Sequence, residues 1–438
     1  MDTLILEDFR GFAGRHEVPI RPLTLLVGEN STGKTSFLAA VRAAHDLRSI
    51  ATLDFNEDPF HLGSYDQIAN YRGGRAGRAR SFVLGQQLTV EAGRSRRRGR
   101  GRAGAEMRVQ ASFRSEKAQP LISYFLVSSG EHQLQLSASE GDTHYISFLV
   151  DDEVIFEREV DDQIGGSIGR FPETPGFLFY NARYATRDDG LRNMNPSDRD
   201  AFDLLVESVA FHVEPRPYAF APIRTSPRRT YDPTTEVRDP EGSHIPMMLE
   251  RLLVNGAQSD FKERLEEFGR SSGLYSSLRI RKMGRKGSDP FQIEVRPPGG
   301  GMARNLIDVG YGVSQAIPII ADCVSAEPGA TLLIQQPEVH LHPRAQAEMG
   351  SFFRQLASSG RNPVVVETHS DYLVDRIRMD VRDEEIKASD VMVLYFEARR
   401  GRVEIHPIEL DAEGRVVEVP PGYRSFFLEE QRRFFGVD

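Results

Sequence analysis

The sequence predicts an α/β fold with a mixed sheet, an inserted antiparallel β meander and a helical region. A glycine-rich loop follows one strand of the mixed sheet. Three observations lead to this prediction. A glycine-rich loop joins a short buried strand to a helix within residues 23–44. Short runs of residues with alternating apolar and polar character follow between residues 82 and 160. Two later apolar runs, at residues 331–334 and 363–366, each end in polar side chains, as strands of a parallel sheet do.

The glycine-rich loop, Gly28–Thr35, fits the pattern G-x-x-x-x-G-K-[ST] of a phosphate-binding P-loop. Glycine lets the backbone curl so that its N–H groups face phosphate oxygens, and the following helix adds its positive end. Lys34 can reach the β- and γ-phosphates, and the Thr35 hydroxyl can hold Mg²⁺. The sequence therefore predicts a P-loop NTPase that uses ATP and Mg²⁺. The predicted nucleotide-binding residues here are Asn30, Ser31, Thr32, Gly33, Lys34, Thr35 and Ser36.

Composition places the chain among ordinary globular proteins, with 438 residues, 39% hydrophobic and 27% charged. The single cysteine, Cys323, excludes an intrachain disulfide and favours a reducing compartment. No apolar run approaches the ~20 residues that span a bilayer, and the acidic N-terminus is unlike a signal peptide. We therefore expect a cytoplasmic protein without membrane contact. The net charge of −9 argues against a uniformly basic nucleic-acid binder.

The first half of the chain is predicted to be rich in strands. Residues 3–9 and 16–20 suggest a strand pair before the P-loop strand. Six β-rich runs then form the meander, at residues 82–90, 106–114, 121–127, 132–138, 144–150 and 153–160. Between the first two runs, the segment Arg94–Arg102 contains arginine with interspersed glycine and serine and cannot bury apolar surface. It is either a solvated hairpin loop or a contact for nucleic-acid phosphates.

The middle of the chain is predicted to be mainly helical, with helices at residues 197–212 and 244–273 and two strands within 276–296. A Pro- and Arg-rich stretch at residues 215–243 carries Arg224, Arg228 and Arg229. It is either a surface loop or a contact for phosphate or another chain. We divide the whole chain into an N-terminal ATPase lobe, the β insertion, the middle region, a C-terminal ATPase lobe and a small extension, at residues 1–70, 71–175, 176–290, 291–396 and 397–438.

The C-terminal lobe repeats the pattern of a strand followed by polar residues and a helix. Gly310 and Gly312 precede Ser314 and an apolar helix, which is a second geometry suited to an anion. The strand at residues 331–334 ends in Gln335, and the strand at 363–366 ends in the segment 367–370. Because ligands of α/β sheets bind at the carboxyl ends of strands, these tips are expected to line one site.

With these motifs in place, the chain resembles the ABC-type ATPases of the RecF, SMC and OLD group. Within this group it is similar to the stand-alone bacterial AAA family ATPases with an OLD-like domain and a small C-terminal extension. Residues 10–12 and the P-loop match the start of such proteins, and residues 310–315 resemble their signature motif. Residues 332–343 resemble the Walker B strand and D-loop, and residues 368–370 resemble the switch segment.

This resemblance implies an ABC-type head that pairs head-to-tail with a second copy, as a homodimer or higher oligomer. ATP on one P-loop would then be covered by Gly312 and Ser314 of the other subunit. His369 would contact the γ-phosphate of its own subunit and sense hydrolysis; a capping or core histidine is the alternative.

One departure from the family pattern concerns the Walker B acids. Gln335 and Gln336 stand where the family has one acid for Mg²⁺ and a second to activate water. Glutamine offers a carbonyl oxygen but cannot accept a proton as a general base. The predicted metal ligands are therefore Thr35 and Gln335, and the predicted catalytic residues are Glu338, Gln336 and His369. Glu367 is the other carboxylate at the strand tips.

Two histidines near the Walker B strand also suggest a metal site. His340 and His342 are two residues apart, but the sequence supplies no clear third ligand for zinc. A D-loop contact with the partner subunit is the preferred interpretation.

Two functions follow from this pattern. The first is an ATP-driven conformational switch in DNA metabolism or defence against phage. The second is an ATP-binding scaffold with little turnover, which recruits or restrains a separate effector such as a nuclease or toxin. A built-in nuclease domain is disfavoured, because the ~60 residues after the switch segment carry no tight acidic cluster.

Overall fold

The computed structural model describes residues 1–48, 53–74, 77–90, 105–138, 144–160, 194–210, 215–234, 237–254, 259–399, 401–424 and 432. The chain forms two compact units. Unit 1 contains residues 1–20, 31–216 and 398–405, and unit 2 contains residues 21–30, 217–397 and 406–438. The division passes through the P-loop, between Asn30 and Ser31.

Unit 1 is built on one eight-stranded antiparallel sheet with the order β2-β1-β4-β5-β6-β7-β8-β9. In β5, buried and half-buried residues alternate, which is the pattern of a strand with one face on a core. The strands are β1 (Thr3–Phe9), β2 (Phe12–Pro19), β4 (Ser81–Val90), β5 (Ala105–Glu116), β6 (Gln119–Ser129), β7 (His132–Ala138), β8 (His144–Val150) and β9 (Glu153–Val160).

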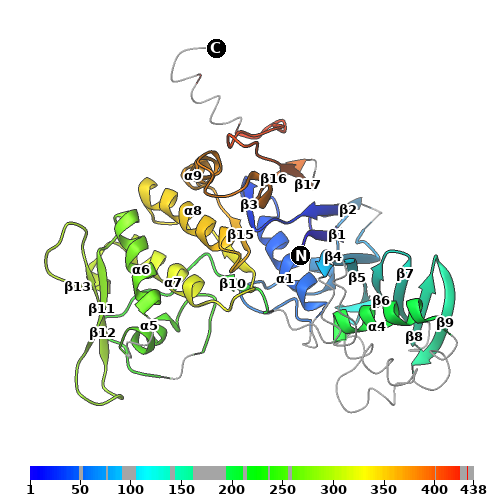
Figure 1. The fold of residues 1–438 in the computed structure, drawn as a ribbon, viewed down its shortest axis with the longest axis horizontal. Helices are drawn as coiled ribbons and strands as arrows, with labels where there is room; N and C mark the ends of the chain where they lie inside the picture. The colour runs from blue at the N-terminus through cyan, green and yellow to red at the C-terminus, as the bar shows by residue number, and fades with distance from the viewer. Residues whose placement is uncertain are drawn as a thin grey trace. The chain divides into compact units, whose positions relative to one another are not determined.

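Within the described residues of unit 1, three helices accompany this sheet. The P-loop helix α1 (Lys34–Asp46) packs against β1 and β4, α2 (Tyr65–Ile68) is a single turn, and α4 (Pro196–Ala210) packs against β6 and β7 (Figure 1). Aromatic rings fill the core between them; Phe82 and Phe113 stack with centroids 4.8 Å apart.

Unit 2 is built on a sheet with the order β10-β14-β15-β3-β16-β17. The first five strands run parallel. Their sequences are nearly continuous apolar runs, because other elements cover both faces of a parallel sheet. The strands are β3 (Leu23–Gly28), β10 (Tyr218–Phe220), β14 (Leu332–Gln335), β15 (Val364–Glu367), β16 (Val391–Arg399) and β17 (Arg402–Ile408), of which residues 398–405 are grouped with unit 1.

Helices and a small antiparallel sheet complete unit 2. Figure 1 shows α5, α6 and α7 beside the sheet of β11, β12 and β13, and α6 also packs against α8. Their bounds are α5 (Ile245–Val254), α6 (Ser259–Ser272), β11 (Ser277–Lys282), β12 (Phe291–Arg296), β13 (Arg304–Asn305), η4 (Leu306–Asp308), α7 (Tyr311–Ser325), α8 (Pro343–Ser358), α9 (Asp371–Arg382) and η5 (Ala388–Asp390).

The α/β class, the meander and the helical region are confirmed, and each predicted meander strand agrees with an observed one to within two residues at its start. Two strands beside the site were not predicted. β10 lies within the Pro- and Arg-rich stretch, and β16 pairs with β3 although its residues were divided between the C-terminal lobe and the extension. The five-segment division of the chain stays a prediction. Among the described residues, no helix has both the length and the apolar character needed to cross a bilayer.

Candidate nucleotide-binding site

The P-loop follows β3 and has the curled backbone that its sequence predicts. Gly28, Ser31 and Gly33 have φ angles of 139°, 62° and 90°. A Cβ atom on Gly28 would lie 2.3 Å from the carbonyl oxygen of Phe396, so only glycine fits there. Gly33 caps α1, whose first residue is the buried Lys34. The loop thus places a lysine and a helix N-terminus directly after a sharp glycine turn.

The tips of three parallel strands come together beside this loop within unit 2. Gln335 on β14 is in register with Glu367 on β15, and Glu367 is in register with Leu26 on β3. The backbone N–H of Gln336 donates to the carbonyl oxygen of Glu367 at 2.8 Å, and that of Thr368 donates to Leu26 at 3.1 Å. The expected meeting of the Walker B and switch segments at one sheet edge is therefore observed, and β3, which leads into the P-loop, ends at the same edge.

The two glutamines of the Walker B segment differ in setting. Gln335 is buried, and its amide nitrogen Nε2 donates to the carbonyl oxygen of Phe220 on β10 at 3.2 Å. Its carbonyl oxygen Oε1 is then the ligand atom that it can offer a metal. Gln336 is half-buried and has a left-handed backbone, with φ of 42°. Neither side chain can take up a proton from water.

Glu338 is the buried carboxylate of this segment. Its Oε1 accepts a 2.6 Å hydrogen bond from the backbone N–H of His369, while its Oε2 is buried without a hydrogen-bond partner. Burial raises the pKa of Glu338, although the hydrogen bond from the His369 N–H and the charge of Arg224 oppose the rise. A carboxylate with a raised pKa and an acceptor atom without a hydrogen-bond partner has the properties of a proton acceptor.

The switch segment presents its residues in different directions. The His369 side chain is exposed at the tip of β15. Thr368 and Ser370 are buried, and Ser370 caps α9 by accepting from the N–H of Leu373 at 3.1 Å. The capping role therefore falls to Ser370, which leaves the exposed His369 ring at the sheet edge where a phosphate is expected.

The structure adds Arg224, which the sequence placed in either a surface loop or a contact loop. Arg224 is only 3% exposed, and its Nη2 donates to the backbone carbonyl oxygen of Gln335 at 3.0 Å. Its Nε and Nη1 are buried without hydrogen-bond partners. Burial lowers the pKa of Arg224 to about 10 and the nearby Glu338 opposes this, so the guanidinium stays charged at neutral pH. The apolar run just before it, Tyr218–Ala221, is the one local sign of burial, and four residues are too few to establish a buried strand from sequence.

The signature segment begins α7. Gly310 is the N-cap residue, Tyr311 is exposed, and Ser314 is buried with its hydroxyl donating to the carbonyl oxygen of Tyr311 at 2.8 Å. A Cβ atom on Gly312 would lie 2.6 Å from the carbonyl oxygen of His340, so the glycine allows the signature turn and the D-loop to approach closely. The groups open to a second molecule are thus the backbone around Gly310 and the Tyr311 side chain.

The two D-loop histidines have separate roles. His340 has a left-handed backbone, and its ring meets Tyr311 edge-on at 4.7 Å. His342 caps α8, with its Nδ1 accepting from the N–H of Ala345 at 3.4 Å. A capping role for His342 accounts for its position without a metal. The segment Arg94–Arg102 lies outside the described residues.

Comparison with known proteins identifies one family. The profile of the family described as "AAA domain, putative AbiEii toxin, Type IV TA system" matches residues 131–375, which is more than half of the chain. The match includes the signature, Walker B and switch segments and begins after the P-loop. No curated protein sequence matches the chain.

Solved structures also match at low identity. A crystal structure of an Smc head bound to the C-winged helix domain of ScpA is 10% identical, with 94% of this chain and 98% of that chain covered and a TM-score of 0.48. An Smc head with an extended coiled coil from Pyrococcus furiosus is 9% identical, with 99% of this chain and 98% of that chain covered and a TM-score of 0.43. The SMC head domain from Thermotoga maritima is 12% identical, covers 93% and 99%, and has a TM-score of 0.37.

Proposed function

We propose that this chain, which belongs to the family described as "AAA domain, putative AbiEii toxin, Type IV TA system", is an ABC-type P-loop ATPase and acts as a nucleotide-driven switch that pairs head-to-tail around ATP. The observation that carries this proposal is the shared sheet edge. β3 leads into the P-loop, and its neighbour β15 brings Glu367 and His369 to the same edge. Phosphates held by the P-loop therefore have polar strand tips beside them.

The residues present fit a nucleotide. Gly28 approaches Phe396 so closely that no side chain is tolerated, and the left-handed Ser31 and Gly33 curl the loop ahead of α1. In this proposal Asn30–Ser36 bind the phosphates, with Lys34 neutralising their charge. Mg²⁺ would be held by the Thr35 hydroxyl and Gln335 Oε1, and it would supply positive charge that offsets the charge of the phosphates.

Glu338 is the proposed proton acceptor, because both Walker B acid positions are glutamine. Its Oε2 is free to accept a hydrogen bond, and its pKa is raised toward the range in which a base works. Gln336 orients the attacking water through its amide, and His369 contacts the γ-phosphate. The signature turn of a second copy, which includes Gly312 and Ser314, completes the site in trans by presenting its exposed backbone at Gly310, as the family resemblance implies.

We place the switch in DNA metabolism or phage defence, acting on a separate effector such as a nuclease or toxin, by analogy with the family. The rival proposal is a scaffold that binds ATP, pairs and turns over little. The uncharged pair Gln335 and Gln336 favours this rival, because it weakens metal binding and removes the usual base.

Two measurements on the same samples separate these proposals. Phosphate release is followed while light scattering after size exclusion gives the mass with ATP present. Both functions predict ATP-dependent pairing, which Lys34→Ala should abolish and Lys286→Ala, an exposed lysine in a turn, should preserve. Pairing without phosphate release supports the scaffold; absence of ATP binding in the wild type refutes both.

A further inference from the structure

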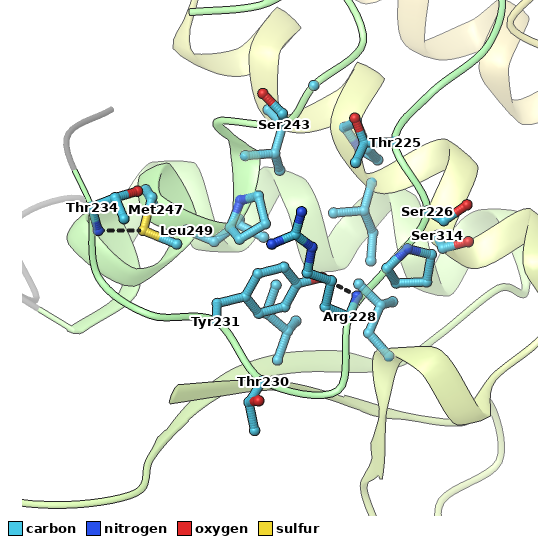
Figure 2. A pocket seen from close by; sticks show the side chains of 18 of the residues that line it. Thr225, Ser226, Arg228, Thr230, Tyr231, Thr234, Ser243, Met247, Leu249 and Ser314 are labelled. Atoms are coloured by element: carbon cyan, nitrogen blue, oxygen red, sulfur yellow. Dashed lines mark hydrogen bonds between the residues drawn. The ribbon is translucent and has the colours of Figure 1, made fainter. Parts of the chain in front are cut away.

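A pocket of about 240 Å³ opens inside unit 2, and its lining residues do not include the strand tips 335–338 and 367–370. Its walls come from the loop 225–234, the start of α5 and the first half of α7, which includes Ser314, Ile317 and Pro318. Figure 2 shows these elements surrounding the cavity. Among the residues assigned to the ATP site, Ser314 is the one that also lines this pocket.

The floor and the mouth of the pocket differ in chemistry. The floor consists of core side chains that are at most 6% exposed, namely Ile245, Leu249, Ile293, Leu306 and Ile317. The mouth carries hydroxyl groups, namely those of Thr225, Ser226, Thr230 and Ser243. A ligand that fits must therefore be apolar at one end and polar at the other.

Arg228 supplies the charge at the mouth. Figure 2 shows its side chain running from the loop into the space beside the Tyr231 ring. Within the described part of the chain its guanidinium forms no ion pair, whereas its neighbour Arg229 is fully engaged with Asp308 at 2.9 and 2.6 Å. The Tyr231 ring is itself held in place by stacking on Phe291 and by the N–H of Arg228.

Asp232 at the same rim limits the ligand's charge, because an acid beside the pocket repels a doubly charged group more than a singly charged one. We propose that this pocket binds a small monocarboxylate with an apolar chain or ring, the carboxylate on Arg228 and the apolar part on the floor. A guanidinium donates two parallel hydrogen bonds to a carboxylate, which suits a single head group.

The pocket is connected to both halves of the ATP site. Arg224, directly before the same loop, donates to the backbone carbonyl oxygen of Gln335. Arg229 in the loop donates to the carboxylate of Asp308, just before the signature turn. Ser314 lies in the pocket wall. A bound carboxylate would thus act as an effector of nucleotide binding; this effect, unlike the binding itself, rests on the proposed function.

The binding test uses the full chain without nucleotide. Saturation-transfer NMR and calorimetry measure butyrate, hexanoate, octanoate and phenylacetate against hexanamide and phenylacetamide. We expect hexanoate or phenylacetate to bind at least tenfold more tightly than its amide, and Arg228→Gln to remove this difference. Arg285→Gln, an exposed arginine outside the pocket, is the matched control.

A second variant protects the test against a folding defect. Ser243→Phe places a ring at the exposed rim and should abolish binding of acid and amide alike. Equal affinity for acid and amide, or full carboxylate affinity in Arg228→Gln, overturns the proposal. Tighter binding of hexyl phosphate than of hexanoate overturns the ligand class. A carboxylate that binds but leaves the dissociation constant of ATP within threefold overturns the effector role alone.

Discussion

The backbone N–H of His369 donates to Oε1 of Glu338 at 2.6 Å, so the switch segment is hydrogen-bonded to the buried carboxylate that follows the Walker B strand. A movement of His369 that follows the γ-phosphate would lengthen this bond. The proton affinity of Glu338 would then rise, because the N–H group stabilises its charged form. In the proposed switch, this pair therefore couples the contact of His369 with the γ-phosphate to the proton affinity of Glu338.

Glu338→Gln should change how stability depends on pH. Since burial raises the carboxyl pKa in the folded state, the wild type binds more protons folded than unfolded between the unfolded pKa, near 4.3, and the folded one. Its free energy of unfolding therefore falls as pH rises through that window, by about 1.4 kcal/mol for every pH unit that separates the two pKa values. The variant lacks this loss, so its stability relative to wild type should increase from pH 4 to pH 7.

Urea denaturation at a series of pH values measures this difference. Glu327→Gln, at an exposed glutamate, serves as the control and should give a constant offset. A constant offset for Glu338→Gln as well would contradict the raised pKa. Under the proposed function, phosphate release should also fall about 100-fold or more in Glu338→Gln, since general-base catalysis contributes about 10²–10⁴-fold.

Arg224→Met should destabilise the fold by about 1–3 kcal/mol, because it leaves Glu338 without its nearby positive charge and the Gln335 carbonyl oxygen without its donor. Adding Glu338→Gln should recover part of this loss. A double-mutant cycle measured by urea denaturation is expected to give a coupling of at least about 0.5 kcal/mol. Additivity within about 0.3 kcal/mol would show that the two buried charges act independently.

Gly28→Ala should cost more than about 3 kcal/mol and abolish ATP binding. Its φ of 139° suits glycine, and the new Cβ would meet the Phe396 carbonyl oxygen at 2.3 Å. Gly299→Ala isolates the backbone contribution, because Gly299 also has a positive φ, of 79°, but has open space around it. That control should cost about 1–2 kcal/mol and leave nucleotide affinity unchanged. Thermal unfolding and calorimetry with ATP compare the two variants. Similar losses of stability and of ATP affinity in both would exclude a role for the Phe396 contact.

Gly310→Phe should prevent ATP-dependent pairing while preserving ATP binding by the monomer. Nothing lies within 4 Å of a Cβ atom on Gly310, so the single chain accepts a side chain there, whereas an approaching nucleotide or second head does not. Gly287→Phe, also in open space but away from the signature, is the control. The mass with ATP, from light scattering, and the ATP affinity decide the outcome. Normal pairing of Gly310→Phe would rule out the head-to-tail arrangement through the signature turn.

Local patterns in the sequence predicted most elements and the P-loop geometry. Alternation located the meander strands, and the glycines at positions 28 and 33 adopt the positive φ angles that the motif requires. The pairing of distant segments was not predictable in this way. β4 joins β1, and β16 joins β3, through backbone hydrogen bonds that leave no periodic signal in either partner.

The buried Arg224 shows the same limit at the level of a side chain. Its Pro- and Arg-rich surroundings indicate an exposed loop, and charged residues are rarely buried without partners. Its burial depends on β10, a strand of three residues that exists only because β14 offers an edge beside it. Three residues are too few for a periodic pattern to reveal.

The position of β3 also governs how the protein must be made. β3 is complete at Gly28, but its partner β15 begins only at Val364, 336 residues later (364 − 28). At about 5–20 residues per second, the ribosome needs roughly 15–70 seconds to supply that partner. Throughout this interval the P-loop strand has neither of its native neighbours. The nucleotide site is therefore among the last parts of the molecule to form during synthesis, and a truncated chain that ends before β15 carries a complete P-loop sequence without a sheet to hold it.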